Sequence, residues 1–576
     1  MQTWPVLSTL IVLPTVGALI ILGMHWIGRY RRRPVPDTVY PTIALFISGT
    51  VFLMTVPVLL FFNGAYSAFQ FAEEWTWIPD WRWSYRVGLD GLSVLLFGLT
   101  ALLTPLAVLS AWKEIRAHVP GFYSLLLFLE TTLLGVFAAT DLAVFYVFWE
   151  LMLIPMFFII FLWGGPRRVY AAFKFLLFTF FGSLFMLAGI LYLYVKTGTL
   201  AFAELQTQLS GQTPLTFTEE IVLFLAFAIA FAIKVPLVPF HTWLPAAHVE
   251  APTPGSVILA GVLLKMGTYG LIRFCIPWFP HAALTFQWPM VVLGVIGIVY
   301  GAWAALAQTD MKRLVAYSSI SHLGLIVVGL FALRPMAVQG AILQMVNHGL
   351  TTGALFMLVG VLYIRRHTRE MASYGGIATV MPRYAAVFLV VMLASIGLPL
   401  LNGFVGEFLI LWGAFQRYPK TTVVAVTGVI WSAVYMLRMY RRVMHGPVDR
   451  EENRTLSDLD GLEWAGMVPI VLLCIWIGVW ATPFLTRTEA ATRRIAEVYT
   501  RVESQISGSD ASHAVLRNQT GANQIRTTVP LPPAAVNRAE PSVANVRHGW
   551  PSPTGSDRWV RPIVPPHACI PTPDEA

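Results

Sequence analysis

The chain has 576 residues, of which 56% are hydrophobic and 12% are charged, and its mean hydropathy is +0.67. These values exclude a soluble globular domain and are typical of a polytopic membrane protein. The net charge of +9 does not indicate a nucleic-acid partner, because the basic residues lie mainly in the loops between apolar runs. The three cysteines are far apart, and no C-x-x-C, G-x-G-x-x-G or P-loop motif is present. We therefore expect no iron–sulfur, zinc or nucleotide site on this chain.

Apolar runs long enough to cross a bilayer recur along the first 485 positions. Each run of about 20 residues predicts one membrane helix. We expect an all-α polytopic membrane protein with about fourteen transmembrane helices, near residues 5–27, 40–62, 89–111, 120–140, 141–163, 171–195, 219–239, 255–276, 288–308, 314–333, 337–364, 384–413, 421–444 and 464–484.

Four charged residues interrupt these apolar runs: Glu150, Lys234, Lys265 and Glu407. A charge near the bilayer centre costs roughly 2.5–3.5 kcal/mol on insertion scales, so such residues normally face a protein interior and have a function. A purely structural ion pair is the alternative. Two residues of each sign favour a pathway that handles charge within the membrane.

The basic loop residues predict the orientation of the chain. When successive loops are assigned alternately to two sides, most Lys and Arg residues fall on one side, including Arg31, Lys113, Arg167, Arg313 and Arg442. Because cytoplasmic loops carry the excess of Lys and Arg, this side is expected to be the inner one. Both termini then lie on the outer side.

An internal repeat and two helix breaks indicate the domain organisation. GSLFMLAGILY at 182–192 resembles GALFMLVGVLY at 353–363, five expected helices later, and an odd offset predicts an inverted repeat like those of secondary transporters. Pro236 and Pro239 follow Lys234, and Pro399 precedes Glu407, so both helices are expected to be broken. The expected parts are N-terminal helices (1–119), a first five-helix repeat (120–280), a second, inverted repeat (281–445), a loop and last helix (446–485) and a polar, mostly disordered tail with a short helix at its start (486–576).

Four motifs carry a resemblance to a known family. They are KVPLVPFHTWLPAAHVEAPTPGSVILAGVLLKMGTYGLIRF at 234–274, FWELMLIPMFFIIFLWGG around Glu150, DMKRLVAYSSISHLG at 310–324 and NGFVGEF at 402–408. The chain resembles the antiporter-like subunits of respiratory complex I, the NADH-quinone oxidoreductase. It is most similar to the M type, called chain 4 in mitochondria, because the family's L and N types have a lysine where this chain has Glu407.

The resemblance implies roles for particular residues. Glu150 would pair with Lys234, Lys265 would be the central proton relay, and Glu407 the terminal site facing the outer side. His322 and His348 match positions between Lys265 and Glu407 that line the route, although a buried histidine can also be a hydrogen-bonded core residue. Lys174 is a weaker site candidate, because a lysine near a helix start can also extend to the interface.

The resemblance also implies a proton-pumping subunit, driven by quinone reduction elsewhere, in the inner membrane of a bacterium. The chain itself would have no redox site, while NADH, FMN, iron–sulfur clusters and quinone would be bound by partner subunits. Sister subunits of the L and N types would flank both ends, membrane lipid would surround the chain, and no metal or nucleic acid would bind. The alternatives are a subunit of an Mrp-type Na⁺/H⁺ antiporter or of a ferredoxin- or hydrogenase-linked relative.

The remaining polar residues have plainer interpretations. His241 and His248 are expected at the rim of the first break, and Asp141 and Glu114 as surface caps. The Trp-rich region 63–88 is expected to be a loop at headgroup level.

Overall fold

The computed structural model describes residues 4–78 and 83–526. It divides into two units, Met1–Ser509 and Asp510–Ala576, and every contact discussed below lies within the first. Twelve helices of the described part are long and apolar enough to cross a membrane. Three shorter helices, α9 (Phe217–Lys234), α19 (Pro382–Ser395) and α20 (Asn402–Phe415), flank the two expected breaks. The all-α membrane fold is therefore confirmed, while the count of fourteen spans stays a prediction.

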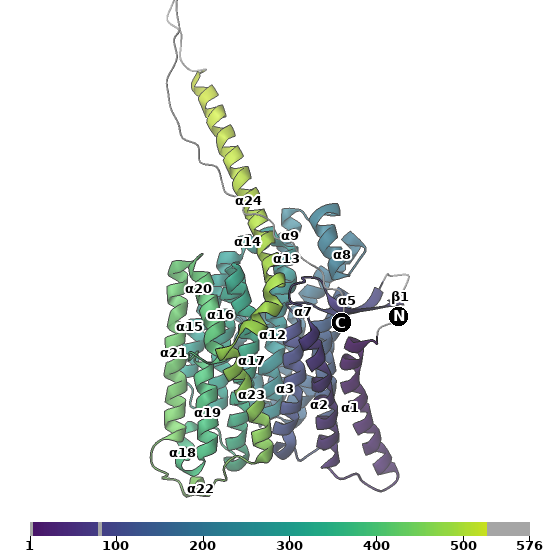
Figure 1. The fold of residues 1–576 in the computed structure, drawn as a ribbon, viewed down its shortest axis with the longest axis vertical. Helices are drawn as coiled ribbons and strands as arrows, with labels where there is room; N and C mark the ends of the chain where they lie inside the picture. The colour runs from purple at the N-terminus through teal and green to yellow at the C-terminus, as the bar shows by residue number, and fades with distance from the viewer. Residues whose placement is uncertain (1–3, 79–82, 527–576) are drawn as a thin grey trace, which may run out of the picture. The chain divides into compact units, whose positions relative to one another are not determined.

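The helices of the first unit stand side by side (Figure 1). The chain begins with α1 (Val6–Tyr30), α2 (Val39–Phe61), α3 (Val94–Glu114), α4 (Val119–Ala138), α5 (Leu142–Leu151), α6 (Leu153–Trp163), α7 (Arg168–Thr197), α8 (Phe202–Thr207), η2 (Gln208–Gln212) and α9. It continues with η3 (Phe240–Thr242), α10 (Trp243–Glu250), α11 (Thr253–Ile258), η4 (Leu259–Leu263), α12 (Leu264–Gly270), η5 (Leu271–Cys275), α13 (Ile276–Trp278), α14 (Pro280–Thr285), α15 (Gln287–Leu306), α16 (Met311–Phe331) and α17 (Pro335–Arg366). The last part contains η6 (Met371–Ser373), α18 (Ile377–Val380), α19, α20, α21 (Pro419–Met444), α22 (Glu451–Arg454), α23 (Gly461–Val479) and α24 (Thr482–Arg526).

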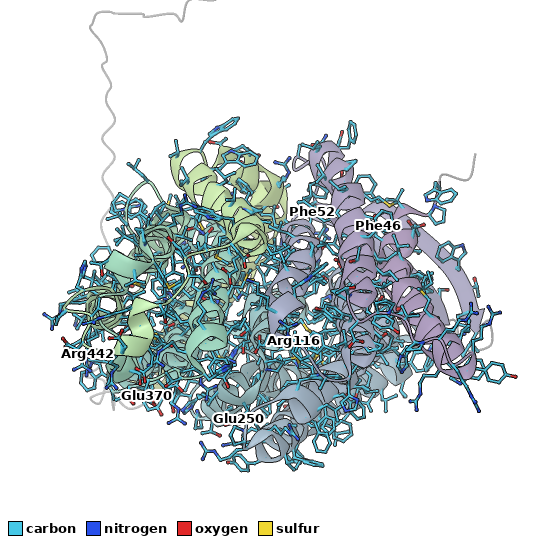
Figure 2. All side chains as sticks on the ribbon, turned by 90° about the horizontal axis from the view of Figure 1, so that it is seen from below. Phe46, Phe52, Arg116, Glu250, Glu370 and Arg442 are labelled. Atoms are coloured by element: carbon cyan, nitrogen blue, oxygen red, sulfur yellow. The ribbon has the colours of Figure 1, made fainter. Side chains whose placement is uncertain are left out.

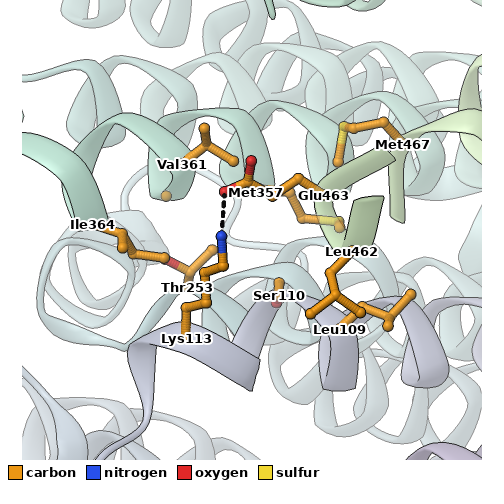
Figure 3. Close-up of a pocket in the computed structure, with 11 residues that line it drawn as sticks. Leu109, Ser110, Lys113, Thr253, Met357, Val361, Ile364, Leu462, Glu463 and Met467 are labelled. Atoms are coloured by element: carbon orange, nitrogen blue, oxygen red, sulfur yellow. Dashed lines mark ion pairs between the residues drawn. The ribbon is translucent and has the colours of Figure 1, made fainter. Parts of the chain in front are cut away.

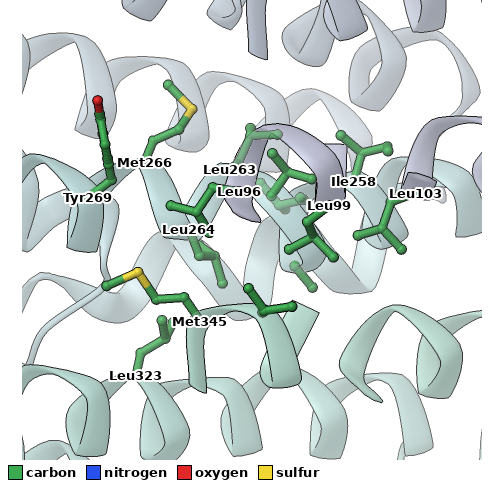
Figure 4. Close-up of a cluster of buried hydrophobic side chains, with 14 of the residues drawn as sticks. Leu96, Leu99, Leu103, Ile258, Leu263, Leu264, Met266, Tyr269, Leu323 and Met345 are labelled. Atoms are coloured by element: carbon green, nitrogen blue, oxygen red, sulfur yellow. The ribbon is translucent and has the colours of Figure 1, made fainter. Parts of the chain in front are cut away.

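Two of the spans are enclosed by the others. The apolar windows of Thr253–Trp278 and of α17 are 100% buried, whereas that of α1 is 39% buried. Leucine side chains of α3 pack against Ile258, Leu264 and Met266, and Met345 of α17 closes the other side of this cluster (Figure 4). An enclosed helix can carry polar side chains without exposing them to lipid. The helices of Lys265 and His348 are these enclosed ones.

The Trp-rich region that we expected to be a loop contains a hairpin of two antiparallel strands, β1 (Gln70–Ile78) and β2 (Trp83–Leu89). Glu73 of β1 fixes the hairpin to the first helix. Its carboxylate accepts hydrogen bonds from the backbone N–H groups of Leu7 (2.7 Å) and Ser8 (3.0 Å), which no side chain of α1 caps. A carboxylate at a helix start satisfies free N–H groups and complements the helix dipole.

Charged residues gather at the end of the molecule that carries α18 and α22. A view onto this end shows Arg116, Glu250, Glu370 and Arg442 (Figure 2). Here the guanidinium of Arg365 binds both carboxylate oxygens of Glu463, each at 2.7 Å. Lys113 of α3 lies 3.8 Å from the same carboxylate, beside a small pocket between α3, α11, α17 and α23 (Figure 3). These pairs connect α23 with the helices around Lys265.

The last helix is longer than the short helix that we expected at the start of the tail. α24 extends to Arg526, and its side chains are described as far as Ser504. Ala491, Ile495, Tyr499 and Val502 form a buried stripe along one face, and the Tyr499 hydroxyl donates to the Ile276 carbonyl at 3.0 Å. This apolar stripe explains why the segment is ordered despite its polar composition. The rest of the expected disordered tail, 527–576, lies outside the described residues.

Candidate functional site

The first helix break lies where the prolines predicted it. α9 ends at Lys234, and the backbone N–H of Leu237 bonds to the Ala232 carbonyl at 2.8 Å instead of continuing the helical pattern. The carbonyl of Ile233 accepts a hydrogen bond of 2.8 Å from the Trp243 indole N–H. Because a buried carbonyl without a partner is costly, Trp243 stabilises the break. Lys234 is thus the last residue of a helix that stops inside the protein.

The Lys234 ammonium lies in an aromatic and thioether environment. Its Nζ is 3.7 Å from Met152 Sδ and lies over the rings of Trp149 (5.3 Å) and Phe175 (5.5 Å). The side chain is 1% exposed. Aromatic faces attract a cation, but they neutralise it less than a carboxylate does.

Glu150 lies near Lys234 but does not form the expected ion pair. Both residues are described, and no contact of 4.0 Å or less joins their charged atoms in this part of the chain. Glu150 precedes the junction of α5 and α6, where Pro155 removes the N–H that would bond the Leu151 carbonyl. Its Oε1 atom is buried and has no hydrogen-bond partner among the described residues. The two charges are therefore close but separate in this conformation.

Lys265 lies between two π-helical segments that the sequence did not predict. η4 precedes and η5 follows the short helix α12 that carries it. Its Nζ donates to the carbonyl of Ala260, five residues earlier, and lies 2.8 Å from Nδ1 of His348. π-Helical turns occur frequently at functional sites. Lys265 is fully buried, so its ammonium group contacts these two groups and the surrounding protein rather than solvent.

His348 begins a row of buried groups that ends at Glu407. The ring centroids of His348 and His322 are 5.6 Å apart, and His322 Nδ1 is 3.4 Å from Oε1 of Glu407. None of these residues is more than 6% exposed. Nε2 of both histidines is buried without a hydrogen-bond partner among the described residues. The structure thus brings Lys265, His348, His322 and Glu407 together in one row, which we call the central row.

The second helix break holds the end of the central row. α19 ends at Ser395 and α20 begins at Asn402, so Glu407 lies in the second turn of α20. Gly397 in the connection has a φ of +75°, and a Cβ atom there would lie within van der Waals overlap of Glu407 Oε2. Only glycine combines this backbone conformation with so close an approach.

The two loop histidines differ from the rim residues that we expected. His248 on α10 is 0% exposed, stacks on Phe356 at 4.6 Å, and has no hydrogen-bond partner for either ring nitrogen among the described residues. His241 is buried as well, with Nε2 3.0 Å from the Tyr300 hydroxyl. Most of α10 is buried, so His248 lies inside the helical bundle rather than at its rim.

The other polar candidates lie apart from the central row. Lys174 is half-buried over the rings of Tyr170 and Phe178. Asp141 caps α5 as expected, accepting from Ala143 N at 2.8 Å, but it is buried rather than on the surface. The half-buried Glu114 carboxylate accepts from the Thr253 backbone N–H at 3.1 Å, at the start of α11.

Sequence reasoning missed several buried charges, among them Glu130, Asp90 and Arg273. Glu130 of α4 is 1% exposed, and both carboxylate oxygens lack a hydrogen-bond partner among the described residues. It interrupts an apolar run as Glu150 does, so the same signal was available. Asp90 and Arg273 form a bidentate pair with distances of 2.5 and 2.7 Å, but their positions near helix ends gave no sign of burial.

The part of the chain that the structure describes contains no group of three or more His, Cys, Asp or Glu residues placed to hold a metal ion. Cys275 and Cys474 are free thiols and are buried.

Comparisons with known proteins agree on one family. The family model described as "NADH:quinone oxidoreductase/Mrp antiporter, TM" matches residues 139–432. NADH-quinone oxidoreductase subunit M of Rhodobacter capsulatus is 45% identical over 455 residues, which are 78% of this chain and 88% of the relative. Subunit M of Rickettsia prowazekii (strain Madrid E) is 40% identical over 84% of this chain and 96% of the relative. NADH-ubiquinone oxidoreductase chain 4 of Arabidopsis thaliana is 41% identical over 83% of this chain and 94% of the relative.

Solved structures share the same fold. A chain of respiratory complex I from Thermus thermophilus with bound NADH superposes with a TM-score of 0.77 and 35% identity, covering 86% of this chain and 99% of that one. A chain of the Mrp complex from Dietzia sp. DQ12-45-1b superposes with a TM-score of 0.74 over 86% of this chain and 99% of that one. Its sequence identity is 20%, so the similarity shows the fold alone.

The broken helices and the enclosed central row define an antiporter-like membrane subunit. Within that class, the chain belongs to the family of NADH-quinone oxidoreductase subunit M.

The contact between Gly397 and Glu407 can be tested by comparing two glycines. Gly198 also has a positive φ, +71°, but a Cβ there meets nothing within 4 Å. Gly198→Ala should cost only the backbone strain, about 1 kcal/mol, whereas Gly397→Ala should cost that strain and also displace the Glu407 carboxylate. We expect a larger fall in the apparent midpoint of thermal unfolding of the purified complex for Gly397→Ala. Equal midpoints for the two variants would contradict the close approach.

Proposed function

We propose that this chain is the proton-translocating membrane subunit of an NADH-quinone oxidoreductase, and that protons pass along the central row. The observation that carries the proposal is the row of neighbouring buried groups from Lys265 through His348 and His322 to Glu407. The chain's membership of the subunit M family supports the assignment of this subunit to an NADH-quinone oxidoreductase. Quinone reduction on other subunits supplies the energy.

The chemistry of the central row suits stepwise proton transfer. A neutral imidazole can accept a proton at one nitrogen and release one from the other, so two histidines in series can transmit protons. The 2.8 Å contact of Lys265 with His348 is within direct transfer distance. The two rings are farther apart, and their free Nε2 atoms are positions where a water molecule can bridge. Glu407 then receives the proton and passes it to the outer side.

Glu150 and Lys234 supply the coupling step in this proposal. Moving one proton against about 180 mV requires about 4 kcal/mol, at about 2.3 kcal/mol per 100 mV. Breaking a buried ion pair costs about 3–5 kcal/mol, which is the same size. We infer that conformational work from the redox subunits makes and breaks contact between these residues. The separated arrangement described above then corresponds to the unpaired state.

Lys174 is retained only as a peripheral candidate near the inner interface.

The remaining parts of the proposal concern organisation and surroundings. We propose that 120–280 and 281–445 are inverted repeats, each with one broken helix, after the N-terminal helices 1–119. Sister subunits of the L and N types flank both ends, and NADH, FMN, iron–sulfur clusters and quinone bind to partner subunits. The chain lies in the bacterial inner membrane. An Mrp-type antiporter is the weaker alternative, because the Mrp chain is 20% identical and the complex I chain 35%.

The relay roles can be tested by removing one ionisable group at a time. Glu407→Gln and Lys234→Ala should each abolish most proton pumping and slow the coupled quinone reduction, because each removes a proton site beside a helix break. Glu407→Asp, which keeps a carboxyl group, should be much milder. The measurement is proton uptake by inverted membrane vesicles during NADH oxidation, with assembly of the complex checked on native gels. Normal pumping by either of the first two variants in an assembled complex would refute the relay.

The orientation can be tested by labelling single cysteines in intact cells, in a background without the native cysteines. His367 and Ser504 are both exposed. An impermeant maleimide should label a cysteine introduced at Ser504 and should leave one introduced at His367 unlabelled, because the basic loops lie inside. The reverse pattern would contradict the proposed sidedness. Lysed cells, in which both positions should react, serve as the control.

A further inference from the structure

A group of uncharged amides surrounds the carboxylate at the end of the central row. Gln344 and Asn347 lie on the same face of α17 as His348, and Asn402 is the first residue of α20. All three side chains are 2% exposed or less. The NH₂ groups of Asn347 and Gln344 find partners within this group and at Glu407, while Oδ1 of Asn347 and Oδ1 of Asn402 have no partner among the described residues. We call these three residues the amide bracket.

The hydrogen bonds of the amide bracket have a definite direction. Asn347 Nδ2 donates to the backbone carbonyl of Asn402 at 2.7 Å and to Oε1 of Gln344 at 3.3 Å. A backbone carbonyl can only accept, so the NH₂ group of Asn347 must face it. The second N–H of Asn347 then fixes the carbonyl side of Gln344 toward Asn347. Gln344 therefore presents its own NH₂ group to Glu407, where Nε2 lies 3.3 Å from Oε1.

Glu407 is thereby held on several sides. Oε1 faces both Gln344 Nε2 and His322 Nδ1 (3.4 Å), while Oε2 lies against Gly397. Gly406 leaves room for the Gln344 amide, because a Cβ at Gly406 would overlap Gln344 Oε1. The carboxyl group cannot turn away from His322 without losing its bond to Gln344. The bond from Asn347 to Asn402 meanwhile anchors the start of α20 to α17 across the helix break.

We propose that Gln344 is a positioning residue for Glu407, oriented by Asn347 and anchored through Asn402, which keeps the Glu407 carboxyl group within reach of His322. This inference rests on the proposed relay function of Glu407. The amide bracket carries no ionisable group and transfers no proton itself. Its role is to keep the last step of the central row short.

The test begins with Gln344→Met, which keeps the length of the side chain and removes the N–H donor. The rate of proton pumping in inverted vesicles should fall about tenfold, the effect expected for one hydrogen bond to a charged group. Asn347→Leu should give a similar loss, because Gln344 is then no longer oriented. Gln339→Met is the matched control on the same helix. Its amide donates to the Leu485 carbonyl at 2.8 Å, away from the central row, and pumping should be unchanged.

A double variant separates positioning from general stability. Gln344→Met combined with Asn347→Leu should be no worse than either single variant, because both changes remove the same hydrogen bond from Gln344 to Glu407. Losses that multiply in the double variant would show independent effects on stability and overturn the proposal.

The outcome also distinguishes this inference from the proposed function. If Glu407→Gln stops pumping while Gln344→Met pumps normally, the amide bracket has no positioning role and the relay stands. If Glu407→Gln itself pumps normally, the relay fails. If Gln344→Met does not assemble, Gln344→His, which keeps an N–H donor, replaces it. Restored assembly and pumping by Gln344→His support the proposal, and restored assembly without pumping overturns it.

Discussion

A charged side chain inside a membrane is stable only when protein surrounds it, and the arrangement of this chain follows from that constraint. Lys265 and His348 lie on the two spans that the other helices enclose completely. The leucines of α3 and the side chains of α11 and α12 keep lipid away from Lys265. Outer helices such as α1 face lipid instead and carry apolar side chains there. In this enclosed position the Lys265 ammonium group is stabilised by two close partners, the Ala260 carbonyl and His348 Nδ1, instead of by solvent.

The same constraint explains how the two helix breaks are stabilised. The first break frees the Ile233 carbonyl at membrane depth, and the Trp243 indole N–H bonds to it. At the second break, the Asn347 amide bonds to the Asn402 carbonyl and ties the start of α20 to α17. The breaks place Lys234 and Glu407 at positions where a helix stops or starts. At Lys265 the backbone instead widens into π-helical turns, which expose the Ala260 carbonyl to the ammonium group. Helix breaks therefore accompany Lys234 and Glu407, and π-helical turns accompany Lys265.

Sequence reasoning could predict the features that depend on local chemistry. Pro236 and Pro239 located the break after Lys234, and Pro399 located the break before Glu407. Charges inside apolar runs identified four candidate site residues, although the same rule should have included Glu130. Features that depend on distant contacts could not be predicted. Gln344 and Asn402 are unremarkable in sequence, and the π-helical turns beside Lys265 contain no proline. Resemblance suggested the Glu150–Lys234 pair, but their separation depends on how α5 and α9 pack.

The central claim is that Lys265, His348, His322 and Glu407 act in series as one proton path. Its most direct test compares His322→Leu, His348→Leu and the double variant, with protons pumped per electron measured in inverted vesicles that contain the assembled complex. Groups in series predict the same reduced ratio for each single variant and no further reduction for the double variant. A full ratio for His348→Leu, or reductions that add in the double variant, would show that protons do not follow this row.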